Sequence, residues 1–127
     1  MYKRQTVQDF SAVTAACRLV KTAVYDAVGG MDEGFEVAFN DLDVCLSVGN
    51  AGYRVLGTPY AELYHYESKS RGLDTKGPAK ARFEAERRRL EGRYGRRRLI
   101  GDPFYNPNLT LDREDFSESD VLPKWTL

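Results

Sequence analysis

The sequence has little cysteine and histidine, no excess of charge and no long apolar run. Of its 127 residues two are cysteine and one is histidine, and 19 basic side chains balance 19 acidic ones. Two cysteines are too few for a disulfide framework or for a zinc site made of cysteine alone. The balanced charge disfavours a strongly basic nucleic-acid-binding protein. No apolar run approaches the roughly 20 residues that cross a bilayer, and none follows the N-terminus as in a signal peptide, so we expect a cytoplasmic location.

The charge that is present divides the chain into three blocks. The net charge is −2 over residues 1–77, +6 over residues 78–98 and −4 over residues 99–127. The first block is mixed in composition, the second predicts a basic helix, and the third is polar and rich in turn-forming residues. The length suits one domain with a modest core. We therefore expect one folded unit over residues 1–100 and a turn-rich C-terminal tail over residues 101–127.

Hydrophobic spacing predicts an α/β protein. Small apolar residues over 12–20 favour a buried strand. Apolar residues three and four apart predict helices over 21–28 and 39–51, each ended by glycine, and the second with Asn40 as its N-cap. Residues 53–56 and 61–66 are typical of two strands around a turn at 57–59. Pro78 begins a helix that runs to about Tyr94, with Glu84–Arg88 and Arg87–Glu91 at ion-pair spacing.

Two carboxylates near the start of the 39–51 helix are candidates for acid–base chemistry. Residues two apart on a helix point about 200° from each other, so Asp41 and Asp43 cannot share one target. Asp41 is placed in the first turn, which holds a side chain rigidly and favours its ionised form through the helix dipole. That arrangement suits a general base. Acids in a first turn are also common simply because they complement the dipole, and the spacing alone favours this second interpretation.

The single histidine, His65, is followed by polar residues that suit phosphate. Hydroxyl groups and an arginine can bind phosphate oxygens, and they stand directly after His65 at Ser68, Ser70 and Arg71. An imidazole can also complete a divalent-metal site whose other ligands are carboxylates. A lone histidine at the end of a strand is more often a structural residue with satisfied hydrogen bonds, so His65 taken alone is a weak indication of a phosphate or metal site.

The basic helix over 78–98 permits an anion-binding interpretation. Runs of arginine can bind RNA or an anionic membrane surface. Its glutamates stand at pairing distance and its aromatic residues are few, which favours a solvated helix face instead. We therefore place RNA binding last among the alternatives and expect no nucleic-acid partner.

Several short motifs in one order resemble a known family. They are Thr14-Ala15-Ala16-Cys17, Val28-Gly29-Gly30-Met31-Asp32-Glu33-Gly34-Phe35, Asn40-Asp41-Leu42-Asp43, Pro59-Tyr60-Ala61-Glu62-Leu63-Tyr64-His65-Tyr66-Glu67-Ser68 and Asp102-Pro103-Phe104-Tyr105-Asn106-Pro107-Asn108-Leu109. Together they cover about residues 10–112. This series resembles the C-terminal, acceptor-side part of family 2 glycosyltransferases with the GT-A fold, especially the bacterial rhamnosyltransferase-like branch.

The resemblance implies an inverting transfer of a sugar from a nucleotide-diphosphate sugar to an acceptor hydroxyl, in bacterial cell-surface polysaccharide synthesis. It makes Asp41 the general base and places Gly30, Asp32 and Glu33 in the loop that leads to the acceptor. His65 then corresponds to a ligand of a divalent cation, manganese or magnesium, on the donor diphosphate. The other donor-diphosphate residues that it implies, on a closing segment, are Ser68, Ser70 and Arg71.

The chain departs from this family in two ways. Ser47 stands where the family usually has arginine, and the N-terminal nucleotide-binding half with its Asp-x-Asp metal motif is absent. We therefore expect an incomplete mixed sheet with flanking helices, a cation held mostly by ligands outside this chain, and no transferase activity of the chain alone. Exposed sheet edges predict a homodimer. The alternative functions are a non-catalytic truncated homologue or an anion-binding module using residues 78–98. The alternative location is the inner face of the membrane.

Overall fold

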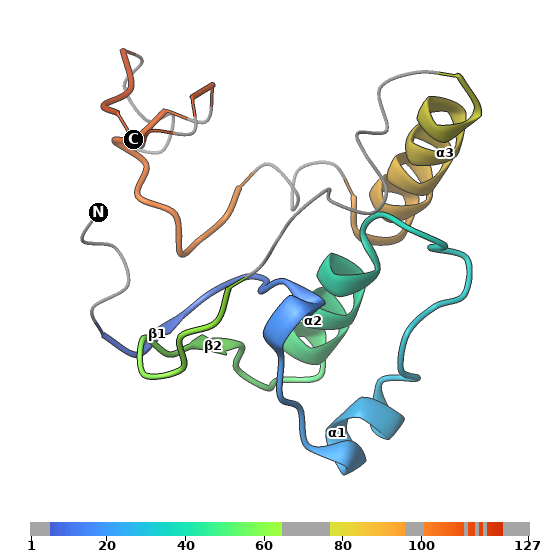
Figure 1. The fold of residues 1–127 in the computed structure, drawn as a ribbon, viewed down its shortest axis with the longest axis horizontal. Helices are drawn as coiled ribbons and strands as arrows, with labels where there is room; N and C mark the ends of the chain where they lie inside the picture. Colours follow the sequence, from blue (N-terminus) through green and yellow to red (C-terminus); the bar gives the residue numbers. More distant parts are fainter. Residues whose placement is uncertain are drawn as a thin grey trace.

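The computed structural model describes residues 6–64, 77–95, 101–110, 112–113, 115 and 117–120. The elements in chain order are β1 (Gln8–Asp9), the 3₁₀ helix η1 (Ala15–Cys17), α1 (Thr22–Ala27), α2 (Asn40–Asn50), β2 (Leu56–Gly57) and α3 (Gly77–Tyr94). Helix α2 lies at the centre of the arrangement, with α3 on one side, the β1–β2 pair on the other and α1 beyond one end (Figure 1). The described part is thus a small α/β arrangement, which is compatible with part of the expected fold.

The core is built around α2, because its apolar residues recur three and four positions apart. Five side chains of this helix are buried, namely Asp43, Val44, Cys45, Leu46 and Val48. Phe35 from the preceding loop and Leu90 from α3 add to the core, at 3% and 2% exposure. The helix expected over 39–51 is confirmed as Asn40–Asn50. The expected N-cap is wrong, because Asn40 is already the first helical residue and Phe39 stands at the N-cap position. Phe39 has a left-handed φ of 65° and makes no side-chain cap.

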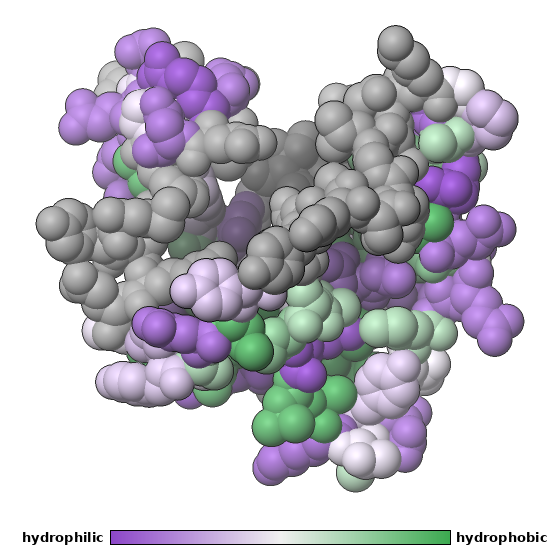
Figure 2. Space-filling model, viewed as in Figure 1, coloured by the Kyte–Doolittle hydropathy of each residue, from purple (hydrophilic) through white to green (hydrophobic). Residues whose placement is uncertain are grey.

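Helix α3 confirms the expected helix over 78–94. Its outer face is laced by ion pairs, because acidic and basic residues three and four apart face each other. Arg87 binds Glu84 at 2.8 Å and Glu91 at 2.9 Å. The predicted Glu84–Arg88 pair is wrong, since Glu84 pairs with Arg87, one position nearer along the chain. Hydrophilic residues cover much of the surface over this helix (Figure 2).

The two short strands form an antiparallel pair. Gln8 lies opposite Gly57 and Asp9 opposite Leu56, and the Phe10 amide extends the ladder by donating to the Val55 carbonyl at 2.9 Å. Only glycine fits at position 57, because a Cβ there would collide with the Phe10 ring. Within the described ranges this pair is the whole sheet, so the larger mixed sheet is not seen there.

Two strand predictions are wrong. Residues 12–20 form the 3₁₀ helix η1 and irregular backbone, because the Thr14 hydroxyl accepts a hydrogen bond from the Ala16 amide at 3.3 Å and closes a local turn in place of a ladder. Leu19 in this segment is fully exposed. Of the strand expected over 53–56 only Leu56 lies in a strand, β2, which continues into Gly57 of the expected turn and pairs with β1 rather than with 61–66. Residues 61–64 are irregular. Residues 65 and 66 lie outside the described part.

Residues 101–104 return to the β1–β2 side of the molecule. There they border a groove of about 570 Å³ together with β1, α2 and residues 53–55. Ser11 donates to Asp102 at 2.7 Å, and Arg54 binds Asp9 through two bonds of 2.8 Å. The described part of the tail beyond residue 104 holds one isolated bridge, Leu109 to Glu118, in place of a longer strand. Among the described residues α3 is the last helix or strand in the chain, and the expected division between a folded unit and a tail at residue 100 stays a prediction.

Candidate functional site

Asp41 lies in the first turn of α2, as predicted, and is half-buried. One oxygen of its carboxylate accepts a hydrogen bond from the next amide, Leu42, at 2.8 Å. Arg18 donates to the Asp41 carbonyl at 3.2 Å rather than to the carboxylate. In the part of the chain that the structure describes, no ion pair engages the Asp41 side chain. It therefore keeps oxygen lone pairs that can accept a proton.

Asp43 points in a different direction and has a different environment, as the helical spacing predicts. Its side chain is only 3% exposed and is bound by Arg93 through two bonds of 2.7 and 2.9 Å. The Tyr94 hydroxyl adds a hydrogen bond of 2.8 Å to the same carboxylate. A buried carboxylate held by a guanidinium and a hydroxyl is a structural anion. The two aspartates thus differ in environment: the Asp43 carboxylate is buried in an ion pair, whereas the Asp41 carboxylate is half-buried and has no ion pair among the described residues.

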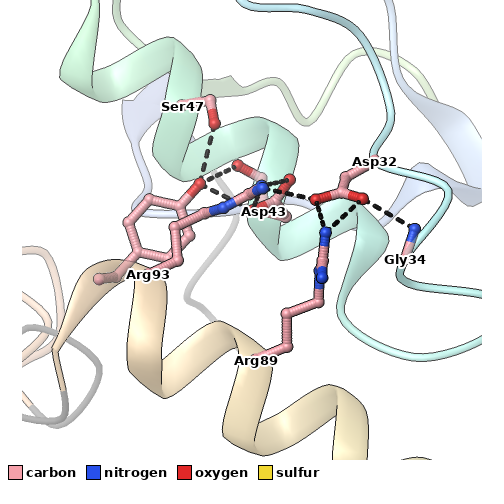
Figure 3. Close-up of polar contacts among 7 residues, drawn as sticks. Asp32, Gly34, Asp43, Ser47, Arg89 and Arg93 are labelled. Carbon is pink, nitrogen blue, oxygen red and sulfur yellow. Dashed lines mark hydrogen bonds and ion pairs between the residues drawn. The ribbon is translucent and has the colours of Figure 1, made fainter.

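Asp32 belongs to the same polar cluster (Figure 3). Arg89 and Arg93 both reach its carboxylate from α3, with Arg89 bound at 2.8 Å. The Gly34 amide donates to it at 2.7 Å and closes a tight turn. These donors, Arg89 first, lower the pKa of Asp32 from 3.8 to about 2. Asp32 is therefore ionised at neutral pH, and its carboxylate accepts hydrogen bonds from groups of this same chain.

The other two residues of the predicted acceptor loop flank Asp32 differently. Gly30 has a φ of +67°, and its amide donates to the Tyr25 carbonyl at 2.9 Å, so the loop turns back over α1. The Tyr25 hydroxyl accepts from the Met31 amide at 3.1 Å and fixes the same turn. Glu33 is exposed. The structure thus places this loop next to the start of α2 through Asp32 and Arg93, while the acceptor role of Gly30, Asp32 and Glu33 stays a prediction.

Ser47 and Tyr94 complete the cluster beneath Asp43. The Tyr94 hydroxyl lies 2.8 Å from the Ser47 hydroxyl and 2.9 Å from the Asp43 carbonyl. Burial raises the pKa of Tyr94. Ser47 stands one turn after Asp43, where an arginine would face the same carboxylate. In this chain the charge that neutralises Asp43 comes from Arg93 on α3, and the pKa of Arg93 is raised accordingly, chiefly by its bonds to Asp43.

Comparison with known proteins identifies relatives of this chain. It is 47% identical over 121 residues to an uncharacterized protein, y4gI, of Sinorhizobium fredii (strain NBRC 101917 / NGR234), covering 94% of this chain and 13% of that protein. It is 34% identical over 110 residues to the O-antigen biosynthesis protein RfbC of Myxococcus xanthus, covering 85% and 8%. It is 32% identical over 62 residues to an N-acetylglucosaminyl-diphospho-decaprenol L-rhamnosyltransferase of Mycobacterium tuberculosis, covering 49% and 20%. This chain is similar to part of a bacterial O-antigen biosynthesis protein and, over 62 residues, to part of a rhamnosyltransferase.

This relationship confirms the resemblance to rhamnosyltransferase-like sequences. The chain spans 20% or less of the length of each of these curated relatives. No protein-family model matches it, and no solved structure does. The relationship therefore applies to a segment, and the activity of the whole relatives comes to this chain only as a proposal.

The residues of this chain that are predicted to bind the donor lie outside the described residues; they are His65, Ser68, Ser70 and Arg71. Within the described ranges, no three histidine, cysteine, aspartate or glutamate side chains gather in a way that could hold a metal ion. The described carboxylates of the cluster are bound by arginine instead, so this part of the chain does not fit a cation. No helix among the described residues has the length and apolar character needed to cross a membrane.

The arginines that organise the site are not evident from the sequence pattern. The charge pattern places Arg89, Arg93 and Glu86 on a solvated basic helix, whereas all three contact the loop before α2 or α2 itself. A stripe of residues three and four apart, in which charged and apolar residues alternate, could have identified Glu86 and Arg93. Its members are Phe83, Glu86, Leu90 and Arg93. Such a mixed stripe indicates a helix face that meets a polar loop rather than solvent.

Proposed function

We propose that this chain is the acceptor-side part of a family 2, GT-A-fold glycosyltransferase that inverts the anomeric centre of its sugar. The proposal is supported by the relationship to rhamnosyltransferases and O-antigen biosynthesis proteins. One name concerns O-antigen biosynthesis, and the other concerns rhamnose transfer to a sugar linked to diphospho-decaprenol. These names support a nucleotide-sugar donor and a glycan or lipid-linked acceptor for the parent protein. The parent would act in the cytoplasm or at the inner face of the membrane.

The observation that carries the proposal is the contrast between Asp41 and Asp43. A general base needs an oriented carboxylate that is free to take a proton. Asp41 is oriented by the first turn of α2 and by the Leu42 amide. Asp43 is instead buried under Arg93 and Tyr94. In the proposed reaction Asp41 accepts the proton of the acceptor hydroxyl while the oxygen of that hydroxyl attacks the anomeric carbon. The bond from this carbon to the diphosphate oxygen breaks on the opposite face, and the nucleoside diphosphate leaves with the bonding electron pair.

The contacts of α3 favour this proposal over an anion-binding module. Arg87 is paired with Glu84 and Glu91, while Arg89 and Arg93 are bound to Asp32. These three arginines are paired with carboxylates of the same chain, so an anion would have to displace those carboxylates to bind them. A divalent cation, when bound on the donor diphosphate, would offset charge on the leaving group. We propose that His65 and residues outside this chain hold it.

The first test is substitution of Asp41 in the full-length parent protein. Asp41→Asn is expected to abolish sugar transfer and to leave donor binding unchanged, because the amide keeps the shape of the side chain but cannot take the proton. Transfer is measured with radiolabelled nucleotide sugar. Asp26→Asn, at an exposed position in α1, is the matched control and should retain wild-type turnover. Normal turnover of Asp41→Asn would remove Asp41 from the role of base.

The second test asks whether this chain alone holds a donor site. Calorimetric titration with UDP- and dTDP-sugars, with and without manganese, is expected to show no binding, because the proposed nucleotide-binding half is not in the chain. The full-length parent should bind one of these donors under the same conditions. Metal-dependent binding by the isolated chain would show that it forms a donor site by itself and would contradict the proposed division of the fold.

A further inference from the structure

From Phe83 to Arg93, one face of α3 contacts the segment that leads into α2 and the start of α2 itself. The Phe83 ring packs against the Phe39 ring, with centroids 5.0 Å apart. One turn further on, the Glu86 carboxylate accepts a hydrogen bond from the Ala38 amide at 2.7 Å. Glu86 is itself buried, at 4% exposure. A hydrogen bond from a backbone amide to a buried carboxylate is a strong one, so α3 restrains the backbone at Ala38, immediately before α2.

Arg93 lies at the other end of this face and joins three parts of the structure. It binds Asp43 in α2 and Asp32 in the preceding loop at once, as Figure 3 shows. Its guanidinium also lies 5.9 Å from the centre of the buried Phe35 ring, within the range of a cation–π contact. Arg89 stands at 5.5 Å from the same ring and binds Asp32 as well. The loop over 32–39 is thereby held against α3 at both of its ends.

The contacts made by Phe83, Glu86 and Arg93 of α3 surround Phe39, which lies two positions before Asp41, and we call this group of contacts the clamp. Phe39 has a left-handed φ of 65°, which is uncommon for a bulky side chain and persists only where the surroundings impose it. Its carbonyl accepts the Asp43 amide at 2.8 Å and closes the first turn of α2. Asp43 is in turn fixed by Arg93. Asp41 stands between these two fixed points, so its orientation depends on both.

We propose that Arg93 is a positioning residue for Asp41. By bridging Asp32 and Asp43, Arg93 holds the acceptor loop and the first turn of α2 in one geometry and so fixes the direction of the Asp41 carboxylate. The inference rests on the proposed function, in which Asp41 is the base. The guanidinium is needed because its planar fork reaches two carboxylates, whereas an ammonium group is a compact point charge.

The first experiment tests the clamp in the 127-residue chain, without any assay of transfer. Backbone amide hydrogen exchange is compared in wild type, Arg93→Lys and Arg88→Lys. Arg88 is an exposed neighbour on α3 and serves as the matched control. Arg93→Lys is expected to accelerate exchange at residues 38–43 and to leave α1 unchanged, and Arg88→Lys to change neither. Unchanged exchange at 38–43, or faster exchange throughout the chain, would overturn the proposal.

The second experiment measures sugar transfer by the full-length parent. Arg93→Lys is expected to lower kcat by about 10- to 100-fold, because small displacements of a reacting group have effects of this size, with the KM for the donor unchanged. Arg93→Ala should lose at least as much, and added guanidinium ion should partly restore its kcat. Restoration by a small cation would not occur if the variant had only lost its fold.

The outcomes separate this inference from the proposed function. If Asp41→Asn is inactive and Arg93→Lys has wild-type kcat, the inference fails and the proposed function stands. If Asp41→Asn is active, both fail together. If Arg93→Lys does not fold, the double variant Asp43→Asn/Arg93→Gln takes its place, because it leaves no unpaired buried charge. The double variant should show the same loss of kcat at unchanged KM, and a wild-type kcat would overturn the inference.

Discussion

Asp32 is the residue whose ionisation matters most for the clamp. Hydrogen bonds from Arg89, the Gly34 amide and Arg93 lower its pKa from 3.8 to about 2. Because the pKa is lower in the folded than in the unfolded state, the stabilisation is fully present above pH about 4. It is lost as the pH falls from about 4 to about 2, when the folded chain also takes up the proton.

We expect the free energy of unfolding of Asp32→Asn to be lower than that of wild type by a constant amount between about pH 5 and 7. The difference should shrink as the pH falls from about 4 towards 2, because wild type then loses the same charge. Urea unfolding at a series of pH values measures it. Glu33→Gln, at the exposed next position, is the control and should follow wild type throughout. A difference that does not change down to about pH 2 would contradict the assignment of the low pKa to Asp32.

For single residues, local spacing was sufficient to predict the position of Asp41 but not its environment. Asp41 stands in the first turn of α2, and the start of that helix follows from residues close to it in the chain. Arg93 binds both Asp43 and Asp32, and it lies 50 residues after Asp43 and 61 residues after Asp32 in the chain. Contacts at such separations depend on how the helices pack, and nothing in the local pattern around Asp43 indicates them.

At the scale of elements, α3 depends on its buried stripe more than on its exposed ion pairs. Leu90 is 2% exposed and is the apolar member of the stripe that faces the core. We expect Leu90→Ala to lower the free energy of unfolding by about 2–4 kcal/mol, the usual cost of removing a buried leucine side chain. Arg88→Ala, on the exposed face, should change it by no more than about 0.5 kcal/mol. Thermal unfolding followed by circular dichroism measures both, and equal effects would show that α3 does not pack through Leu90.

Helices are predicted better than strands for a physical reason. The bounds of α2 and α3 follow from hydrogen bonds within each segment, so spacing and turn residues are sufficient. A strand exists only where a second segment supplies the ladder. Val55 and Leu56 pair with residues 8–10, far away in the chain, and the apolar run over 12–20 has no such partner in the described part. The expected mixed sheet needs ladders of this long-range kind, so its strand order stays a prediction.

At the scale of the whole molecule, several large apolar side chains face solvent. Leu19 is fully exposed, and Tyr60, Leu63 and Tyr64 are exposed by 84%, 68% and 90%. Hydrophobic groups also come to the surface near α1 (Figure 2). In the proposed full-length parent, further chain would cover such groups. In the isolated chain they are available to a second copy, and burial of apolar area favours association by roughly 25 cal/mol per Å².

We therefore predict that the isolated chain forms a homodimer in which exposed apolar side chains, Leu19 among them, become buried. Sedimentation equilibrium over a range of protein concentrations should show mass rising from that of the 14.4 kDa chain towards twice that value. Leu19→Lys is expected to weaken the association, because it puts a charge where a fully exposed leucine stands. Thr22→Lys adds the same charge at an exposed position nearby without removing an apolar group, and it should associate as wild type does. A chain that remains monomeric at every concentration would show that these side chains are tolerated in water and that no second copy covers them.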